Sequence, residues 1–242
     1  MAPLPPTFEA RLASARALTP GVRELTFERV DGQPMVFEPG QWVSAVFGQA
    51  KRSYSIASHP DDSPRFEIAV TRVPNGPAST HLHALEPGGL LRFTGPQGFF
   101  TRSGALSSAP ALFVATGTGV TPMRSMLRAA APTSVPVWLV LGVRREEDLI
   151  YEDEFRDLAR RHPAFRFEPT LSQPGAPWTG RRGYVQTHVR ALWDELSAVT
   201  GAGQPPPHAF VCGLERMVGS VRDLLRKEMG LPRQQVHSER YD

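Results

Sequence analysis

The stretch Ala115-Thr116-Gly117-Thr118-Gly119-Val120-Thr121-Pro122 decides the fold of the second half of this chain. The apolar run 112–115 leading into it predicts a buried strand, and the residues after it predict a helix with Thr121 as N-cap and Pro122 in its first position. The two glycines let an anion approach the backbone, where a helix N-terminus supplies free N–H groups. Pro122 stands where a G-x-G-x-x-G motif has its third glycine, and the Lys-Ser/Thr pair of a P-loop is absent. The stretch therefore predicts a strand, turn and helix that together hold a phosphate group.

Strands and helices alternate from this turn to the carboxyl end. This alternation predicts a parallel sheet with right-handed crossovers. The loop 201–207, rich in Gly and Pro, lies inside the pattern and so is not a domain boundary. The expected strands are 112–115, 135–142, 165–171 and 209–212, and the expected helices are 122–131, 152–161, 186–196 and 215–229.

The first hundred residues have a different pattern. Short alternating segments such as 23–28, 42–47 and 65–71 are separated by Asp-Gly, Pro-Gly, Asn-Gly and Pro-Gly-Gly turns, which is typical of an antiparallel barrel. Residues 101–110, rich in Ser, Gly and Ala, read as a linker. We therefore expect two domains, an antiparallel β-barrel over residues 1–104 and a parallel-sheet α/β domain over residues 110–242.

Composition narrows the class of protein. The 242 residues carry a formal net charge of +3 and include one cysteine, Cys212, which excludes a disulfide, a Cys-rich zinc site and a Cys-ligated iron–sulfur cluster within this chain. The arginines are dispersed among acidic residues without a recognition motif, so we expect no nucleic-acid partner. No apolar run approaches the ~20 residues of a membrane span and the N-terminus lacks signal-peptide features, so we expect a cytoplasmic protein with no membrane contact.

Two motifs in the first domain could carry chemistry. Arg52-Ser53-Tyr54-Ser55 alternates as a strand, and on its own it is compatible with an ordinary sheet surface. An Arg can also fork onto a diphosphate, an aromatic ring can cover a flavin, and a small hydroxyl can approach a redox-active ring. Asn75–Leu82 is a turn leading into a short helix, with Ser79 either as an N-cap or as a phosphate ligand.

Taken together, the motifs resemble those of the ferredoxin–NADP reductase family, two-domain flavoproteins with an FAD-binding barrel and a nicotinamide-binding α/β domain. The resemblance covers nearly the whole chain and rests on several motifs in the family's order. They are Arg52-x-Tyr54-Ser55, Gly76-x-x-Ser79, Gly95-Pro96-x-Gly98-x-Phe100, Thr116-Gly-Thr-Gly-Val-Thr-Pro122, Cys212-Gly213 and Glu239-Arg240-Tyr241.

The resemblance implies FAD as cofactor and assigns roles in the barrel. By it, Arg52 binds the FAD diphosphate, Tyr54 packs on the isoalloxazine ring and Ser55 sits near flavin N5. Ser53 belongs to the same motif, Ser79 and Thr80 hold the diphosphate, and Gly76 lies in the turn before them. The segment Val70, Thr71 and Arg72 flanks the flavin tail.

The same resemblance assigns the coenzyme site. Thr116, Gly117, Thr118, Gly119, Thr121 and Pro122 would take the diphosphate of the pyridine nucleotide. Cys212 and Gly213 would lie near the nicotinamide, although a lone Cys on an apolar strand is otherwise a core residue. The tail carries Glu239 as a proton relay and Tyr241 as an aromatic ring on the flavin, and Asp242 follows where plant-type members end.

Coenzyme choice is less strongly marked. The family's plant-type members use a Ser-Arg pair after the strand that ends here at Ser172, but Gln173 stands in the Arg position. Arg181 and Arg182 are candidates for holding a 2′-phosphate, because guanidinium matches its geometry, and a solvated loop pair is the alternative. The pair Arg144-Arg145 is another candidate, but the acidic run 146–148 beside it favours a solvated turn. We therefore expect NADP(H) over NAD(H).

The implied activity is hydride transfer from NAD(P)H to FAD, followed by transfer of single electrons to a separate ferredoxin or flavodoxin. Ser55, Cys212, Glu239 and Tyr241 are the candidate catalytic residues. Two other enzyme functions stay open, a reductase component of an oxygenase and a reductase of free flavin, and so does a flavin-binding redox sensor without turnover. The pair His81-x-His83, placed on a strand, lacks a third ligand, so we expect no metal site.

Overall fold

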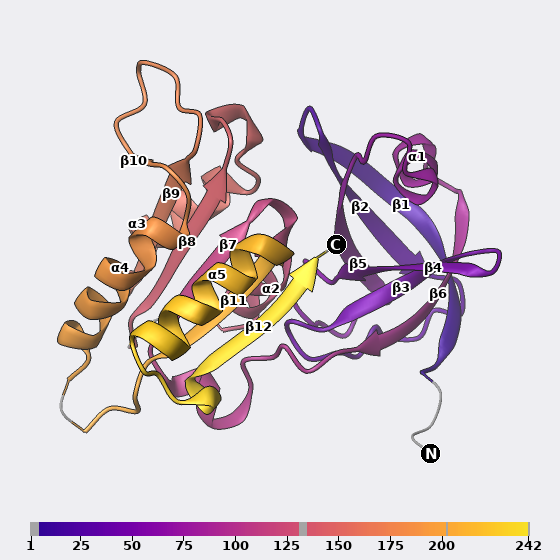
Figure 1. The fold of residues 1–242 in the computed structure, drawn as a ribbon. Helices are drawn as coiled ribbons and strands as arrows, with labels where there is room; N and C mark the ends of the chain where they lie inside the picture. Colours follow the sequence, from indigo (N-terminus) through magenta and orange to yellow (C-terminus); the bar gives the residue numbers. More distant parts are fainter. Residues whose placement is uncertain (1–4, 131–134, 202, 242) are drawn as a thin grey trace. The chain divides into compact units, whose positions relative to one another are not determined.

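The computed structural model describes residues 5–130, 135–201 and 203–241 (Figure 1). The chain forms two compact units, one made of Met1–Arg102 with Thr121–Ala129 and the other of Ser103–Val120 with Ala130–Asp242. Four earlier expectations touch residues outside the described ranges: the first four residues, Ala131 at the end of a helix, Ala202 in the loop 201–207, and Asp242 in the tail. The domain limits at 104 and 110 stay a prediction.

The first unit holds a six-stranded antiparallel sheet in the order β4-β3-β6-β1-β2-β5. An isolated bridge between Ile56, just after β4, and Ile68 in β5 joins the two edge strands, so the sheet closes on itself as a barrel. The predicted antiparallel barrel is confirmed. Its elements are β1 Thr7–Thr19, β2 Val22–Arg29, β3 Trp42–Phe47, β4 Ala50–Ser55, β5 Arg65–Thr71, helix α1 Pro77–Ala84 and β6 Leu90–Gln97.

Four aromatic rings fill the centre of the barrel. Phe8, Phe27, Phe66 and Phe93 come from four different strands, and the centroids of the rings in contact lie between 4.9 and 5.9 Å apart. Each is buried on the inward face of its strand, and the residues that flank it in the sequence are exposed or half-buried, except for the buried Thr94 beside Phe93. This core fixes the strand register and therefore the places where the site-bearing loops leave the barrel.

The second unit holds a parallel sheet in the order β10-β9-β8-β7-β11-β12 (Figure 1). From β7 the chain moves to β8 on one side and later returns to β11 on the other. The strand order therefore reverses at β7, and open α/β sheets bind ligands outside the carboxyl ends of the strands at such a point. The strands are β7 Ala111–Thr116, β8 Val137–Val143, β9 Phe165–Leu171, β10 Arg181–Arg182, β11 His208–Leu214 and β12 Val236–Tyr241.

Helices cover both faces of this sheet. Val189 of α4, Gln186–Val199, and Val218 of α5, Glu215–Asp223, share one core cluster with Val114 and Val211. Helix α3, Glu152–Arg161, lies on the other face, where its Phe155 ring packs 5.3 Å from that of Phe167. The parallel α/β domain is confirmed.

Several local expectations were wrong in detail. Thr121 is the first residue of helix α2, Thr121–Ala129, and not its N-cap, because the turn before it, Gly117–Val120, is itself a 3₁₀ helix. The expected helix 215–229 ends as α5 at Asp223 and continues as a π-helical turn, Leu224–Glu228.

Two more segments differ from their predictions. The linker contains a 3₁₀ turn, Gly104–Ser108. His81 and His83 lie on helix α1 and not on a strand. The Asn75-Gly76 turn and Pro77 in the first helical turn begin a helix that includes both histidines.

Candidate functional site

The Arg52 motif occupies the end of β4. Arg52 is exposed and donates to the Lys51 carbonyl at 2.8 Å, and no carboxylate within the described ranges pairs with it. Burial raises the pKa of Tyr54 to about 12 against the opposing effect of the Arg52 charge, so its phenol is neutral. Ser55 is buried, and Ser53 shares a hydrogen bond of 3.2 Å with Ser44 on β3. The strand thus offers an unneutralised guanidinium beside a neutral aromatic ring.

Helix α1 brings backbone donors to the same unit. Pro77 has no N–H, and the first intrahelical bond runs from Thr80 N–H to the Gly76 carbonyl, so the N–H groups of Ala78 and Ser79 are the ones that a helix start leaves unpaired. The Ser79 hydroxyl is buried, accepts from Val73 N–H at 3.1 Å and donates to the Gly76 carbonyl at 3.0 Å. The Ser79 side chain therefore closes the turn, and the Ser79 backbone N–H remains at the N-terminal end of the helix.

Strand β5 completes the barrel part of the candidate site. Val70 is buried, whereas Thr71 and Arg72 are exposed at the strand end. The Ile56–Ile68 bridge sets the end of the Arg52 motif beside β5, and the Phe47 ring at the end of β3 packs 5.6 Å from His81 of α1. The structure therefore collects the nominated residues of β4, β5 and α1 in one unit. A guanidinium, two backbone N–H groups and an aromatic ring form a donor set that fits a flavin carrying a diphosphate.

The glycine-rich turn sits at the switch point of the second unit. Thr116 ends β7, and its hydroxyl accepts from Leu214 N–H at 3.2 Å. A Cβ on Gly119 would clash with the Cys212 carbonyl, and one on Gly213, whose φ is 139°, would clash with the Thr116 hydroxyl. The turn and the end of β11 thus pack backbone against backbone, which requires glycine in both segments. This arrangement leaves a backbone-lined edge that a phosphate can approach.

Gly117 and Thr118 lie in the same 3₁₀ turn and are half-buried. Thr121 and Pro122 are buried at the start of α2. The structure places α2 with the barrel unit, so these two residues and Thr116–Gly119 belong to different units. The nominated diphosphate turn is therefore divided between the units at residue 120.

The tail is a strand. β12 pairs in parallel with β11, so that Cys212 stands opposite Glu239 and Leu214 opposite Tyr241. Cys212 is fully buried, and burial, followed by the nearby Glu239 charge, raises the pKa of its thiol well above its ordinary value, while a hydrogen bond from the Tyr241 side chain acts in the opposite direction. Cys212, Glu239 and Tyr241 therefore form one cluster around a protonated thiol.

The side chains of Arg181 and Arg182 both donate hydrogen bonds within the protein. Arg181 donates to Glu168 at 2.7 Å, and Glu168 also pairs with Arg166. Arg182 is exposed and donates to the Trp178 carbonyl at 2.7 Å. Of the two, Arg182 has the guanidinium without a carboxylate partner in the described part of the chain.

Sequence reasoning missed a buried ion network in the barrel unit. Arg124 of α2, 4% exposed in its side chain, donates to Glu67 at 2.6 Å and to the Ala57 carbonyl at 3.0 Å, and lies 3.6 Å from Glu24. Ala57 and Glu67 stand close in sequence to Ser55 and Val70. The sequence carries no clear signal for this network, because α2 also contains Ser125 and Arg128 and so does not mark Arg124 as its buried charge.

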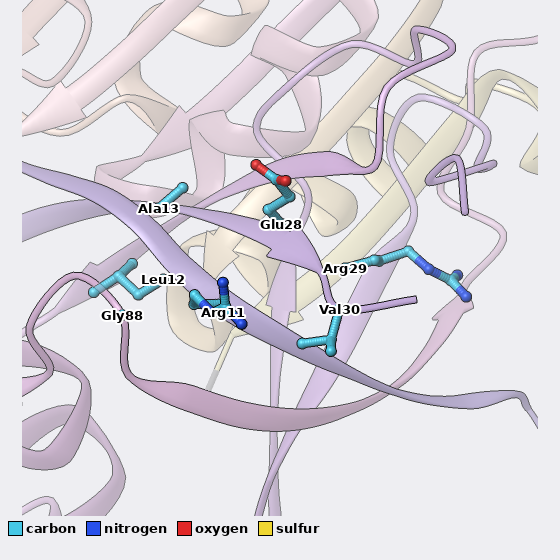
Figure 2. A pocket seen from close by; sticks show the side chains of 7 residues that line it. All are labelled: Arg11, Leu12, Ala13, Glu28, Arg29, Val30 and Gly88. Atoms are coloured by element: carbon cyan, nitrogen blue, oxygen red, sulfur yellow. The ribbon is translucent and has the colours of Figure 1, made fainter. Parts of the chain in front are cut away.

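A pocket of about 310 Å³ lies elsewhere on the barrel (Figure 2). It opens between β1 and β2 where the register shifts after Leu12, which leaves Ala13 as the bulged residue. None of the nominated site residues lines it, so it is separate from the candidate site. Its lining residues are Arg11, Leu12, Ala13, Glu28, Arg29, Val30 and Gly88.

Within residues 5–130, 135–201 and 203–241, no group of three or more His, Cys, Asp or Glu side chains could hold a metal ion. Over the same residues, none of the helices has the length and apolar character that crossing a membrane requires.

Comparison with known proteins gives two family matches. Residues 9–101 match the oxidoreductase FAD-binding domain, and residues 113–223 match the oxidoreductase NAD-binding domain. The two matches fall on the barrel and on the parallel-sheet part of the chain respectively.

Three individual proteins are informative. The chain is 57% identical to ferredoxin–NADP reductase B of Sorangium cellulosum over 97% of this chain and 98% of that protein. It is 27% identical to the phenol hydroxylase P5 protein of Acinetobacter pittii, covering 97% of this chain and 65% of that one. The crystal structure of a ferredoxin NADP⁺ reductase from Neisseria gonorrhoeae with bound FAD and NADP has the same fold, with a TM-score of 0.77 and 21% identity over 97% of this chain and 98% of that one.

Proposed function

Because the chain belongs to the ferredoxin–NADP reductase family, we propose that it is an FAD-dependent oxidoreductase that exchanges electrons between NADP(H) and a ferredoxin. The observation that carries this proposal is the similarity to ferredoxin–NADP reductase B over nearly the full length of both chains. Bound FAD supplies the exchange between two-electron hydride chemistry and single-electron transfer. The protein's own residues bind, orient and shield the reacting groups.

The FAD site that we propose lies in the barrel unit. Arg52 would pair with the diphosphate, because its guanidinium has no carboxylate partner in the described part of the chain. The N–H groups at the start of α1 would add two donors, and the exposed Thr80 hydroxyl a third. Tyr54 would cover the isoalloxazine ring, since its neutral phenol presents an apolar face. Ser55, buried at the strand end, would stand beside the redox-active edge of the ring.

The coenzyme site that we propose lies at the switch point of the second unit. Thr116 and the close-packed glycines Gly119 and Gly213 would admit the diphosphate to the backbone. Cys212, kept as a neutral thiol, would form one wall for the nicotinamide without placing a negative charge there. Glu239, which stands opposite Cys212 in the β11–β12 pairing, would act as the proton relay beside this wall.

Recognition of the 2′-phosphate is assigned to Arg182 first and Arg181 second. Arg182 is exposed, whereas Arg181 would have to share its guanidinium with Glu168. Flavodoxin as an additional acceptor is part of this proposal.

A second candidate function is a reductase component of an oxygenase. The observation favouring it is the similarity to the phenol hydroxylase P5 protein over 97% of this chain, although the chain spans only 65% of that protein. No motif in the sequence separates the two functions, so the acceptor has to be identified by experiment.

The test begins with the purified protein. Released cofactor is identified by mass spectrometry, and FAD is expected. Stopped-flow mixing with NADPH and with NADH then measures flavin reduction, and cytochrome c reduction is followed with and without added ferredoxin. Rapid reduction by NADPH together with ferredoxin-dependent cytochrome c reduction is expected. Bound FMN, or a folded protein that retains no flavin in excess FAD, contradicts the proposal.

A further inference from the structure

Helix α1 cannot fix its own position. It has eight residues, its N-cap Gly76 offers no side-chain hydrogen bond, and no acidic residue lies in its first turn. Helices shorter than about 12 residues are marginal on their own and depend on packing. Only Ser79 and Leu82 of this helix are buried. Something other than the helix must therefore hold the orientation of its N-terminal N–H groups.

Arg23 holds the other end of this helix. Its Nη1 donates to the carbonyls of His83 at 2.7 Å and Leu85 at 2.9 Å, with that of Leu82 at 3.3 Å. The last carbonyls of a helix lack intrahelical partners, and a cation there also complements the helix dipole. No carboxylate in the described residues pairs with Arg23, so its charge serves these carbonyls.

A second side chain anchors the same turn. His83 Nε2 lies 2.9 Å from the Val70 carbonyl, and because a carbonyl only accepts, this nitrogen carries the proton. Val70 is the partner of Arg23 in the β2–β5 register. Arg23 and His83 therefore tie the carboxyl end of α1 to one row of two neighbouring strands. That row lies at the end of β5, from which the chain turns back toward the start of the helix.

We propose that Arg23 is a positioning residue of the FAD site. By donating hydrogen bonds to the carbonyls at the carboxyl end of α1, it orients the N–H groups at the other end of the helix toward the FAD diphosphate. The inference rests on the proposed function. Eight residues span about 12 Å, so a tilt of roughly 10° about the anchored end moves the free end by about 2 Å. A hydrogen bond does not survive a displacement of that size.

The Arg23 contacts should therefore affect binding of the FAD diphosphate and not binding of the isoalloxazine ring. This distinguishes positioning from general support of the fold, because riboflavin has the ring but no phosphate. The experiment compares Arg23→Met and Arg23→Lys with wild-type protein. Arg65→Met is the matched control, because Arg65 lies on β5 of the same barrel and, within the described residues, its guanidinium pairs only with Glu28, at 2.8 Å.

Dissociation constants for FAD and for riboflavin are measured by equilibrium dialysis of the purified proteins. Arg23→Met is expected to weaken FAD binding about tenfold, as the loss of one charge-assisted contact would, with riboflavin binding unchanged. Arg23→Lys should recover part of the loss, because an ammonium keeps the charge but reaches fewer carbonyls. Arg65→Met should bind both ligands as wild type does.

Equal weakening of FAD and riboflavin by Arg23→Met, or FAD binding no weaker than in Arg65→Met, overturns the inference. If Arg23→Met does not fold, Arg23→Lys decides: a two- to fivefold rise in the FAD dissociation constant alone supports the inference, and an unchanged constant overturns it. Wild-type protein that binds no FAD would instead overturn the proposed function.

Discussion

Replacing Arg124 by Met tests how firmly helix α2 is fastened to the barrel strands. Its Nη1 lies 2.6 Å from Glu67 and 3.6 Å from Glu24, and its side chain is 4% exposed. Arg128, one turn later, reaches the same Glu67 oxygen at 3.1 Å, but its side chain is 32% exposed. The two arginines share a carboxylate and differ in burial, so Arg128→Met is a matched control.

The magnitudes follow from burial. Removing one partner of a buried ion pair costs about 3–5 kcal/mol, because the remaining charge is left without compensation. Glu67 keeps Arg128, and Glu24 keeps Arg16 at 2.6 Å, so the lower end, about 3 kcal/mol, applies to Arg124→Met. A partly exposed pair contributes about 0–1 kcal/mol, which sets the expectation for Arg128→Met.

The assay is urea unfolding of the purified protein, followed by far-UV circular dichroism and by flavin fluorescence, which reports the barrel unit. With a slope of about 2 kcal/mol/M, a loss of 3 kcal/mol lowers the midpoint by about 1.5 M, against less than about 0.5 M for the control. Equal midpoint shifts for the two variants would refute the reasoning, because burial would then not determine the cost.

Four further outcomes are expected. Arg52→Ala should weaken FAD binding about ten- to a hundredfold, measured by flavin fluorescence, since a diphosphate loses a charge-assisted partner; unchanged affinity counts against its role. Replacing Arg181 and Arg182 together by Ala should raise KM for NADPH and leave that for NADH nearly unchanged, with most of the effect retained in Arg182→Ala alone; a wild-type preference for NADH contradicts this. Cys212→Ser should retain FAD and slow flavin reduction several-fold in stopped-flow mixing. The rate of the wild-type protein should show no titration near the ordinary thiol pKa of 9.0, because the raised pKa of Cys212 keeps its thiol protonated through that range. Deleting the chain from Tyr241 onward should lower the Kd for oxidised coenzyme, because the Tyr241 side chain lies beside the Cys212 thiol, where we propose that the nicotinamide binds. Equal affinity of the wild-type and truncated proteins in titrations would assign the tail to sheet pairing alone.

Patterns carried by neighbouring residues were predicted well. Helix α3 and strand β9 have the expected bounds, Glu152–Arg161 and Phe165–Leu171. In α3, acidic residues begin the helix and basic residues end it, which favours the helix through its dipole. In β9, Phe165 and Phe167 alternate with Arg166 and Glu168, and this period-two pattern was sufficient. The Gly-rich turn after β7 was also placed correctly, because its strand-to-helix context is local.

Contacts between distant segments were not predictable from the pattern. Arg124 and Glu67 are 57 residues apart, and each reads in the sequence as a solvated charge. Arg181 and Arg182 read as an equal pair, but Glu168 on the neighbouring strand neutralises only the first. The tail was assigned roles only through the resemblance, and the pairing of β12 with β11 shows that it continues the sheet. In each case the deciding partner comes from another strand or helix.

These distant contacts act on short segments that carry the nominated residues. Helix α1 has eight residues and the turn Gly117–Val120 has four, so neither has enough local stability to keep a hydrogen-bonding geometry. Arg23 supplies the missing constraint to α1 through three carbonyls, and the glycine contacts between Gly119 and the end of β11 supply it to the turn. A cofactor site must hold its donors to within a few tenths of an ångström, so the motif residues make the contacts and residues outside the motifs set their precision. Substitutions at these outside positions should therefore change ligand affinity without touching the ligand.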